Sequence, residues 1–541
     1  MIGLHISEKQ FYTEKKHPCI KKKCKGLYVT LSYHHLDYRQ VFFENKKIVV
    51  FVDGWILNSE NYAKQAEFVA EKYFEYGLKF PEYIEGQFNV LIWDKITNST
   101  FFTNDIFAFR KHFMILKEFI ISADVEFLYS HLNEIKLNHS HIQKNLNQNR
   151  LIDIDETFIE GIRMIRPSSL IDFKNYDFYS IENFKNKYTR KRLTPESFVK
   201  SVRENISKIH RGNSILLELS GGMDSRFLLE NFKILNIPTQ TLSYGLIQSD
   251  ELKIAKAVAS SNNVDHLEIA LEPSDFTKNA PTYQFKTGGL DIFVQSTFQK
   301  ITHRIDSSKF ENHVLETGIG LNNFIGGTQI SKQYEVFSNG FSEHIFNLSK
   351  NDIYTSQLRI FSQLALRQSI HREFMEDRYA MFSYANYYLM KSIPIGRLKN
   401  YKFYEDVAEI VVKNSREVNI QAEMLPFYKI SNQENKRKLK ELENKSLKYY
   451  LLENKLKPHN RYYSDFDMWL RVDAAWIDLI QKTILNTKSH ISRYMALSTI
   501  KKIVQEHNSG LKNNMRLIIR LISTELFLQE TIEYFEKKSN S

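Results

Sequence analysis

A turn of two adjacent glycines between an apolar strand and a helix constrains the fold of this chain more than any other segment. Residues 215–230 read ILLELSGGMDSRFLLE, so an apolar run leads into the turn SGGMDS at 220–225 and a helical pattern follows at once. Glycines adopt backbone angles that other residues avoid, and they let amide groups approach a ligand closely. The start of a helix adds free N–H groups and the positive end of the helix dipole. The segment therefore predicts an anion-binding cradle.

The side chains of the turn indicate how an anion would bind. Ser220 and Ser225 add hydroxyl donors, whereas Asp224 adds a carboxylate at a place otherwise suited to anions. A carboxylate fits there if Mg²⁺ accompanies the anion, because hard cations take oxygen ligands. A plain helix cap is the alternative interpretation, since Asp and Ser favour helix starts and Gly favours turns. The apolar strand before the turn favours the anion site, although the turn has neither the GxxxxGK[ST] spacing nor a lysine.

Strand and helix patterns alternate around this turn. The residue pattern predicts helices over 195–209, 225–235 and 250–261, with strands over 214–219, 239–244 and 266–271. Such alternation is typical of βαβ units and a parallel sheet. The last 200 residues or so are mainly helical patterns rich in Lys, Glu and Tyr.

The first part of the chain shows mostly strand patterns. Short apolar or alternating runs predict strands over 27–32, 40–43, 48–52, 89–93, 100–103 and 119–122. A helical period interrupts them once, over residues 60–76. We therefore expect a mostly antiparallel domain over 1–130, a linker region over 131–192 and a second domain over 193–541.

Composition excludes several classes of protein. Hydrophobic residues make up 42% of the chain and aromatics 13%, which argues against disorder. The two cysteines, Cys19 and Cys24, are too few for a disulfide framework and fit a reducing compartment. They could form half of a metal site, but no second Cys/His pair at suitable spacing accompanies them.

Charge and hydropathy bear on partners and location. The formal net charge is +11, and much of the excess lies in the Lys-rich stretches 15–25 and 436–455. We interpret these stretches as solvated faces rather than a nucleic-acid site, because no arginine stripe interleaved with aromatics occurs. The N-terminus does not resemble a signal peptide, and no run of about 18 apolar residues is present. We expect a cytoplasmic protein without a membrane partner.

The second half resembles a known family. SGGMDS after an apolar strand is similar to the PP-loop of ATP pyrophosphatases, and LSYG at 242–245 resembles the strand that lines the adenine pocket there. Residues 249–271 and 316–328 (ETGIGLNNFIGGT) resemble the asparagine synthetase version of this domain. The resemblance implies a doubly wound α/β domain with a helical tail that uses ATP and Mg²⁺. Its implied ATP-binding residues are Leu219, Ser220, Gly221, Gly222, Asp224, Ser225, Ser243, Gly318 and Gly320.

The first half resembles the class II glutaminase domain of the same family. The matching segments, in order, are VDGWILNSENY (52–62), residues 73–94 and FFTNDIFAFRKHFMI (101–115). The resemblance implies an antiparallel αββα fold of the Ntn type. The family's nucleophilic Cys follows the initiator Met, but here Ile2 stands in that place. Asp53 stands where an oxyanion-hole Asn is expected, and its charge would oppose the developing oxyanion.

Cys19 is a candidate for a nucleophile exposed by processing. The sequence around it, HPCIKKK, does not resemble the family start. Glutamine hydrolysis is therefore expected to be absent. The same loss marks relatives that form β-lactam rings or close lasso peptides.

The synthetase half also departs from the family. Ile319 replaces the catalytic Glu, and Asn322 replaces the Mg²⁺-binding Asp, although its carbonyl oxygen remains a ligand for a metal site shared with Asp224. Residues 457–471 resemble the segment that carries a catalytic Lys; that Lys falls on His459, and Lys457 lies two residues away as a substitute.

Three functions remain open on this basis. The first is an asparagine-synthetase-like ligase that adenylates a small-molecule or peptide carboxylate, releases AMP and pyrophosphate, and uses Lys457 or His459 at the leaving group. The second is a nucleotide-binding scaffold or regulator without turnover. The third is a PP-loop enzyme acting on nucleic acid, which the glutaminase-like domain argues against. Substrate specificity is expected in loops between residues 272 and 312 and in the helical tail, where no motif occurs, and a homodimer is an open alternative to a monomer.

Overall fold

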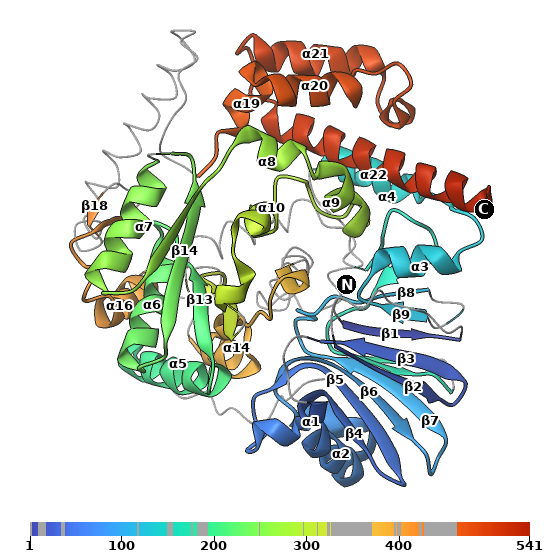
Figure 1. The fold of residues 1–541 in the computed structure, drawn as a ribbon, viewed down its shortest axis with the longest axis vertical. Helices are drawn as coiled ribbons and strands as arrows, with labels where there is room; N and C mark the ends of the chain where they lie inside the picture. The colour runs from blue at the N-terminus through green and yellow to red at the C-terminus, as the bar shows by residue number, and fades with distance from the viewer. Residues whose placement is uncertain are drawn as a thin grey trace.

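Two six-stranded antiparallel sheets and one four-stranded parallel sheet organise the molecule, and a small antiparallel pair joins β17 (Asn419–Ile420) to β18 (Leu425–Pro426) (Figure 1). The computed structural model describes residues 3–8, 18–33, 38–115, 118, 120–148, 155–174, 177–180, 193–247, 249–295, 297–310, 312–321, 325, 371–393, 397, 402–420, 425–426 and 463–540. The architecture is mixed α/β, as the sequence predicts. No helix among the described residues is long and apolar enough to cross a membrane.

The two antiparallel sheets contain the N-terminal strands. The first has the order β10-β8-β9-β1-β3-β2, and the second has the order β12-β11-β7-β6-β5-β4. Strands of the first sheet are β1 (Gly3–Ser7), β2 (Cys19–Cys24), β3 (Leu27–Ser32), β8 (Phe113–Ile115), β9 (Ile120–Ser122) and β10 (Ile162–Met164). Strands of the second are β4 (Phe42–Glu44), β5 (Ile48–Ile56), β6 (Gly86–Asp94), β7 (Ser99–Asn104), β11 (Ser169–Asp172) and β12 (Asp177–Ser180).

Alternating side chains give each sheet two apolar faces. Leu4 and Leu31 of the first sheet pack against Phe51 and Leu91 of the second, forming the core between them. The outer face of the second sheet packs against helix α2 (Gln65–Tyr76). Helix α3 (Val125–His131) packs against β8 and β9 on the opposite side. The layers therefore run helix, sheet, sheet, helix.

Several N-terminal elements differ from the expected ones. Residues 40–43 were expected to form one strand, but α1 (Tyr38–Val41) is helical and β4 starts only at Phe42. A short apolar run does not distinguish a strand from a buried helical turn, which explains the difference. Helix α2 starts at Gln65 rather than near residue 60, after the 3₁₀ turn Tyr62–Lys64.

The stretch expected to be a linker, 131–192, contains paired strands. β10 pairs with β8, and β11 pairs with β7 and β12. These strands complete both antiparallel sheets, which therefore extend to Ser180. The same stretch also contains α4 (His139–Gln148). Long-range strand pairing of this kind leaves little periodic signal in three- or four-residue strands.

The parallel sheet has the order β15-β14-β13-β16. Its strands are β13 (Ser214–Glu218), β14 (Thr239–Gly245), β15 (His266–Ala270) and β16 (His313–Thr317). Helices α5 (Pro195–Ile209) and α7 (Asp250–Ser261) have the expected bounds, and α6 (Met223–Ile234) starts two residues earlier than expected. The sequence pattern predicted the first three strands to within one residue, whereas it did not predict β16.

Helices cover both faces of the parallel sheet. One face packs against α5, α6, α7 and α16 (Lys402–Val411) in a shared apolar core. The other face packs against helices from two later parts of the chain. These are α8 (Pro273–Thr277), α9 (Ala280–Lys286), α10 (Thr297–Ile301), α19 (Phe466–Val472), α20 (Ala474–Lys482), α21 (Leu497–Asn508) and α22 (Met515–Ser539). The arrangement is a doubly wound α/β layer.

Helix α22 joins the two halves of the molecule. It crosses the top of the view in Figure 1 and ends beside α3. There the Lys538 ammonium donates to the backbone carbonyls of Ser130 and Leu132 at 2.7 and 2.6 Å. A cation near the last carbonyls of a helix is stabilising, so α22 is fixed on the N-terminal sheets at this end.

Candidate functional site

The glycine turn lies at the carboxyl end of β13, where the order of the parallel sheet reverses. β14 and β15 lie on one side of β13, and β16 lies on the other. At such a reversal the chain leaves neighbouring strands in opposite directions, which opens a crevice at the carboxyl ends of the strands. Open α/β sheets bind ligands in this crevice. Residues 219–225, predicted from sequence to bind an anion, therefore lie at the usual ligand position of such a sheet.

Hydroxyl groups hold the turn in its curved shape. The backbone N–H of Ser220 donates to Ser225 Oγ, and the backbone N–H of Gly222 donates to Ser220 Oγ, each at 3.1 Å. The two hydroxyl oxygens are themselves 3.1 Å apart. Gly222 is the N-cap of α6 and has no side chain with which to cap the first amides. The serine hydroxyls thus hold the backbone of the turn. No side chain caps the start of α6 at Gly222, so its first N–H groups are available to an anion.

A second glycine loop, 318–320, follows β16 and lies against the start of α6. A Cβ placed on Gly318 would stand 2.6 Å from the backbone nitrogen of Ser225. Gly320 has φ +118°, and a Cβ there would stand 2.8 Å from Met381 Cβ. Only glycine fits both positions, so the two predicted loops meet at one edge of the sheet. Between them Ile319 packs against the apolar core around α5 and α6, where the resemblance expects a carboxylate.

With the nucleotide that the sequence resemblance implies as ligand, replacing Gly318 with alanine is expected to weaken affinity by about tenfold or more. The added methyl group meets backbone atoms that cannot rotate away, and such overpacking costs roughly 1–3 kcal/mol. Binding of a fluorescent ATP analogue measures the effect. Gly26→Ala is the matched control, because Gly26 has φ +88° but lies in open space in the β2–β3 turn. Equal affinity in both variants would show that the loops do not act together.

Helix α6 is held from its other side by α16 and the segment after it. The Tyr404 hydroxyl donates to Asp224 Oδ1 at 2.6 Å. Glu230 accepts the backbone N–H groups of residues 413–415 at 2.7 to 3.0 Å. Arg226 donates to the carbonyls of Gly221 and Val418 at 3.2 and 2.8 Å. Glu230 and Arg226 could have been found from the sequence, because each places a charged side chain in an otherwise apolar helical segment.

Asp224 is the one predicted metal ligand that the structure describes. No group of three or more His, Cys, Asp or Glu side chains suited to a metal occurs in the described part of the chain. Mg²⁺ is usually held by one or two carboxylates together with substrate phosphates rather than by a cage of protein ligands. A single carboxylate beside an anion cradle therefore fits a magnesium ion that arrives with a nucleotide. Asn322, the second predicted ligand, lies outside the described residues.

The remaining predicted residues fall into two groups. The Ser243 hydroxyl donates to the Leu219 carbonyl at 2.5 Å, so these two residues join β14 to the start of the turn. Lys457 and His459 lie outside the described residues. The carbonyl of Tyr463 accepts the backbone N–H of Leu246, directly after β14, at 3.0 Å.

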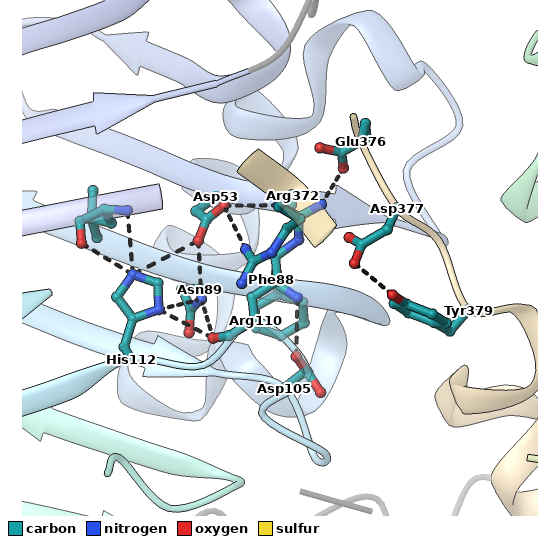
Figure 2. Close-up of polar contacts among 12 residues, drawn as sticks. Asp53, Phe88, Asn89, Asp105, Arg110, His112, Arg372, Glu376, Asp377 and Tyr379 are labelled. Atoms are coloured by element: carbon teal, nitrogen blue, oxygen red, sulfur yellow. Dashed lines mark hydrogen bonds and ion pairs between the residues drawn. The ribbon is translucent and has the colours of Figure 1, made fainter. Parts of the chain in front are cut away.

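A buried polar cluster lies at the other site expected from the sequence (Figure 2). Asp53, which is 3% exposed, accepts from Arg110 at 2.9 Å and from Asn89 at 3.2 Å. The His112 ring lies 3.0 Å from Asn89 Nδ2 and 3.1 Å from the Leu4 carbonyl. A Cβ on Gly3 would stand 3.5 Å from Asp53 Oδ2. The start of β1, one residue after Ile2, therefore lies beside Asp53.

The cluster contains charges from both halves of the chain. Arg110 also donates to Glu376, and Arg372 lies 3.7 Å from Asp53. Burial alone would raise the pKa of Asp53, but Arg110 and Arg372 outweigh it and lower that pKa to about 2. Burial lowers the pKa of His112 to about 4, so its imidazole is neutral. A fixed negative charge at Asp53 would oppose a developing oxyanion.

The segment that carries Glu376 continues into the parallel sheet. The backbone N–H of Leu315 in β16 donates to the Glu376 carbonyl, and that of Arg378 donates back to Leu315, both at 2.9 Å. Tyr379 donates to Asp377 Oδ2 at 2.7 Å, as Figure 2 shows. Residues 376–378 thus form an isolated parallel bridge with Leu315 of β16, and Arg110 joins this segment to the antiparallel sheets.

Comparisons with known proteins add little to this geometry. No protein-family model matches the sequence, and no curated protein sequence matches it. Among solved structures, an NMN synthetase from Francisella tularensis is similar over 33% of this chain and 96% of its own, at 12% identity and a TM-score of 0.21. So loose a similarity says nothing about the reaction.

Proposed function

We propose that this chain is an ATP-dependent ligase that forms an amide from a carboxylate and an amine. The observation that carries the proposal is the meeting of two glycine loops, 219–225 and 318–320, at the strand-order reversal of a parallel sheet. Amides at the start of α6 would bind the phosphates of ATP, and Arg226 adds positive charge beneath the turn. Magnesium, held by Asp224 and the phosphates, would neutralise charge there.

The reaction would proceed in two steps. The substrate carboxylate attacks the α-phosphorus of ATP, the bond to the β,γ-phosphates breaks, and pyrophosphate leaves. The amine then attacks the carbonyl carbon of the acyl-adenylate, loses a proton, and displaces AMP. Lys457 or His459, assigned from the sequence resemblance alone, would face the leaving pyrophosphate. Catalysis in both steps would come from positioning and from charge stabilisation.

The amine would not come from glutamine. At the position of the family nucleophile the chain has Ile2, and the neighbouring Asp53 is paired with two arginines. Free ammonia, or an amine of the substrate itself, is therefore the proposed nucleophile. The proposed acceptor is a small-molecule or peptide carboxylate.

Carboxylate-dependent exchange of labelled pyrophosphate into ATP tests the proposal. The first step is reversible and needs no amine, so a panel of amino acids, dicarboxylates and short peptides can be screened with Mg²⁺-ATP alone. We expect exchange with at least one class of carboxylate and none without Mg²⁺. Absence of magnesium-dependent binding of any adenine nucleotide would overturn the proposal.

A nucleotide-binding scaffold without turnover is the second candidate. Ile319 favours it, because a partly buried apolar side chain packed against the core replaces the carboxylate expected from the resemblance. The loss of one group that stabilises a transition state typically costs about 3–4 kcal/mol. ATP binding without exchange under any carboxylate in the panel would support this candidate.

A further inference from the structure

Glu218 is the last residue of β13 and directly precedes the phosphate turn. Its neighbours in the sheet are Leu242 on β14 and Thr317 on β16. Side chains alternate along a strand, and Leu217 and Leu219 point into the core with α5 and α6. Glu218 therefore projects from the opposite face, on the side of α8, α9 and the helical tail, the segments in which substrate specificity is expected from the sequence.

The Glu218 carboxyl lies among neutral polar groups. The Tyr244 hydroxyl donates to Glu218 Oε1 at 2.9 Å. Burial raises the pKa of Glu218 to about 7, and hydrogen bonds from Tyr244 and Thr317 oppose that rise only in part. Among the described residues no lysine or arginine forms an ion pair with it. A buried carboxylate without an ion-pair partner is stabilised when it binds a cation or a proton.

Other titratable groups lie near Glu218 and Tyr244. Glu251 of α7 and Tyr463 lie near Tyr244, and Tyr379 lies within electrostatic reach of Glu218. Glu251 accepts the backbone N–H of Tyr463 at 3.0 Å, so its carboxylate fixes the tail against the sheet. Burial raises the pKa of Glu251 to about 7 as well. The surroundings of Glu218 thus contain carboxyl and phenol groups, which favour the binding of a positively charged ligand.

We propose that Glu218 is the general base that receives the attacking amine and takes its proton in the second step of the proposed ligase reaction. This inference rests on the proposed function. The amine enters as an ammonium ion attracted to the Glu218 carboxylate and gives one proton to it, which the carboxyl releases to water before the attack. Its nitrogen then forms a bond to the acyl carbon, the bond from that carbon to the AMP oxygen breaks, and Glu218 accepts the second proton. The carboxyl group returns to its ionised form by releasing protons to water.

The position and chemistry of Glu218 suit this role. A general base works best when its pKa is near the operating pH, and such groups typically contribute about 10²- to 10⁴-fold. The hydrogen bonds from Tyr244, which reaches Oε1, and from Thr317 orient the carboxyl. Because Glu218 directly precedes the turn proposed to hold the phosphates, the acyl group on the α-phosphate would lie at the same edge of the sheet.

Glu218→Gln separates this role from nucleotide chemistry. Pyrophosphate exchange with the best carboxylate measures the first step, and AMP release on addition of ammonium chloride or hydroxylamine measures the second. We expect exchange within about threefold of the wild type and ammonium-dependent AMP release lowered by about 100-fold. The wild-type rate should rise as pH passes through about 7, and the variant should lose this rise. Hydroxylamine, a nucleophile already uncharged at neutral pH, should restore part of the rate.

Two further variants sharpen the test. Tyr244→Phe keeps the Glu218 carboxyl but removes the hydrogen bond that orients it. We expect a smaller loss of ammonium-dependent AMP release than in Glu218→Gln, and a rise with pH that remains but is shifted. Glu268→Gln is the neutral control, because Glu268 lies at the surface of β15, paired with Lys256. Equal loss of exchange and AMP release in Glu218→Gln would place this residue in the nucleotide site and overturn the inference. Unchanged AMP release would also overturn it, as would a wild-type enzyme whose AMP release no amine accelerates. Failure of the wild type in exchange itself would instead reject the proposed function.

Discussion

Replacing Arg110 with methionine is expected to lower the free energy of unfolding by about 3–5 kcal/mol. Methionine keeps most of the length of the side chain and removes its charge. Asp53 and Glu376 would then remain in place without the guanidinium that pairs with both. An uncompensated buried charge is costly, whereas the intact pair is close to balanced against its desolvation. The loss should exceed that of any exposed ion pair in the molecule.

Urea unfolding followed by circular dichroism measures this difference. The matched control is Lys95→Met, because Lys95 pairs with Glu44 at 2.8 Å near the surface, where such pairs are worth about 0–1 kcal/mol. A chain of two halves need not unfold in one step, so the midpoints of the resolved transitions are compared. Similar midpoints in the two variants would contradict the role assigned to Arg110.

The pH dependence of the same cluster has a definite sign. The pKa of Asp53 is lowered to about 2 in the folded chain, against about 4 in an unfolded one. Its stabilising contribution is therefore fully present above about pH 4 and is lost as pH falls toward 2. In Arg110→Met the carboxyl loses its main cationic neighbour, so this part of the acid dependence should shrink. A variant with the wild-type acid profile would show that Arg372 alone sets the Asp53 pKa.

The sequence predicted those parts of the fold whose signal is local. Helix α7 has a serine cap, Ser249, followed by a clear apolar period, and its bounds agree with the expectation. The strand-turn-helix at 215–234 is likewise a continuous pattern, and the structure places it at the reversal point of the sheet. Strand β16 was not predicted, since five residues that reach the core by pairing with β13 carry no separate periodicity.

Features that depend on distant partners were missed. β11 lies beside β7 only because about 65 residues of chain return to the sheet, and a linker was expected there. Glu218 looks like one polar residue in an apolar run, and its meaning comes from Tyr244 on the next strand. Arg372 and Glu376 became recognisable as partners of Asp53 and Arg110 only in three dimensions, more than 260 residues away in sequence. Resemblance to a family supplied candidate residues, but not these contacts.

Replacing Asp224 with alanine is expected to abolish magnesium-dependent pyrophosphate exchange, with a fall of at least about 10³-fold. The carboxylate lies in the first turn of α6, between the phosphate cradle and Tyr404. Without this carboxylate the proposed magnesium ion loses a protein ligand, and no cation held there neutralises the phosphate charge at the turn. The expected loss corresponds to roughly 4 kcal/mol, at about 1.4 kcal/mol for each factor of ten.

Two isosteric variants distinguish charge from structure at this position. Asp224→Asn keeps an oxygen that can accept the Tyr404 hydroxyl, yet it removes the negative charge. If the carboxylate serves the metal, this variant should bind ATP without added Mg²⁺ about as well as the wild type and should gain little affinity when Mg²⁺ is added. Tyr404→Phe removes only the 2.6 Å hydrogen bond and should retain exchange within about fivefold. An amide cannot replace the charge of a carboxylate at a cation. Wild-type exchange in Asp224→Asn would therefore show that the metal is held elsewhere and that Asp224 orients the helix through Tyr404.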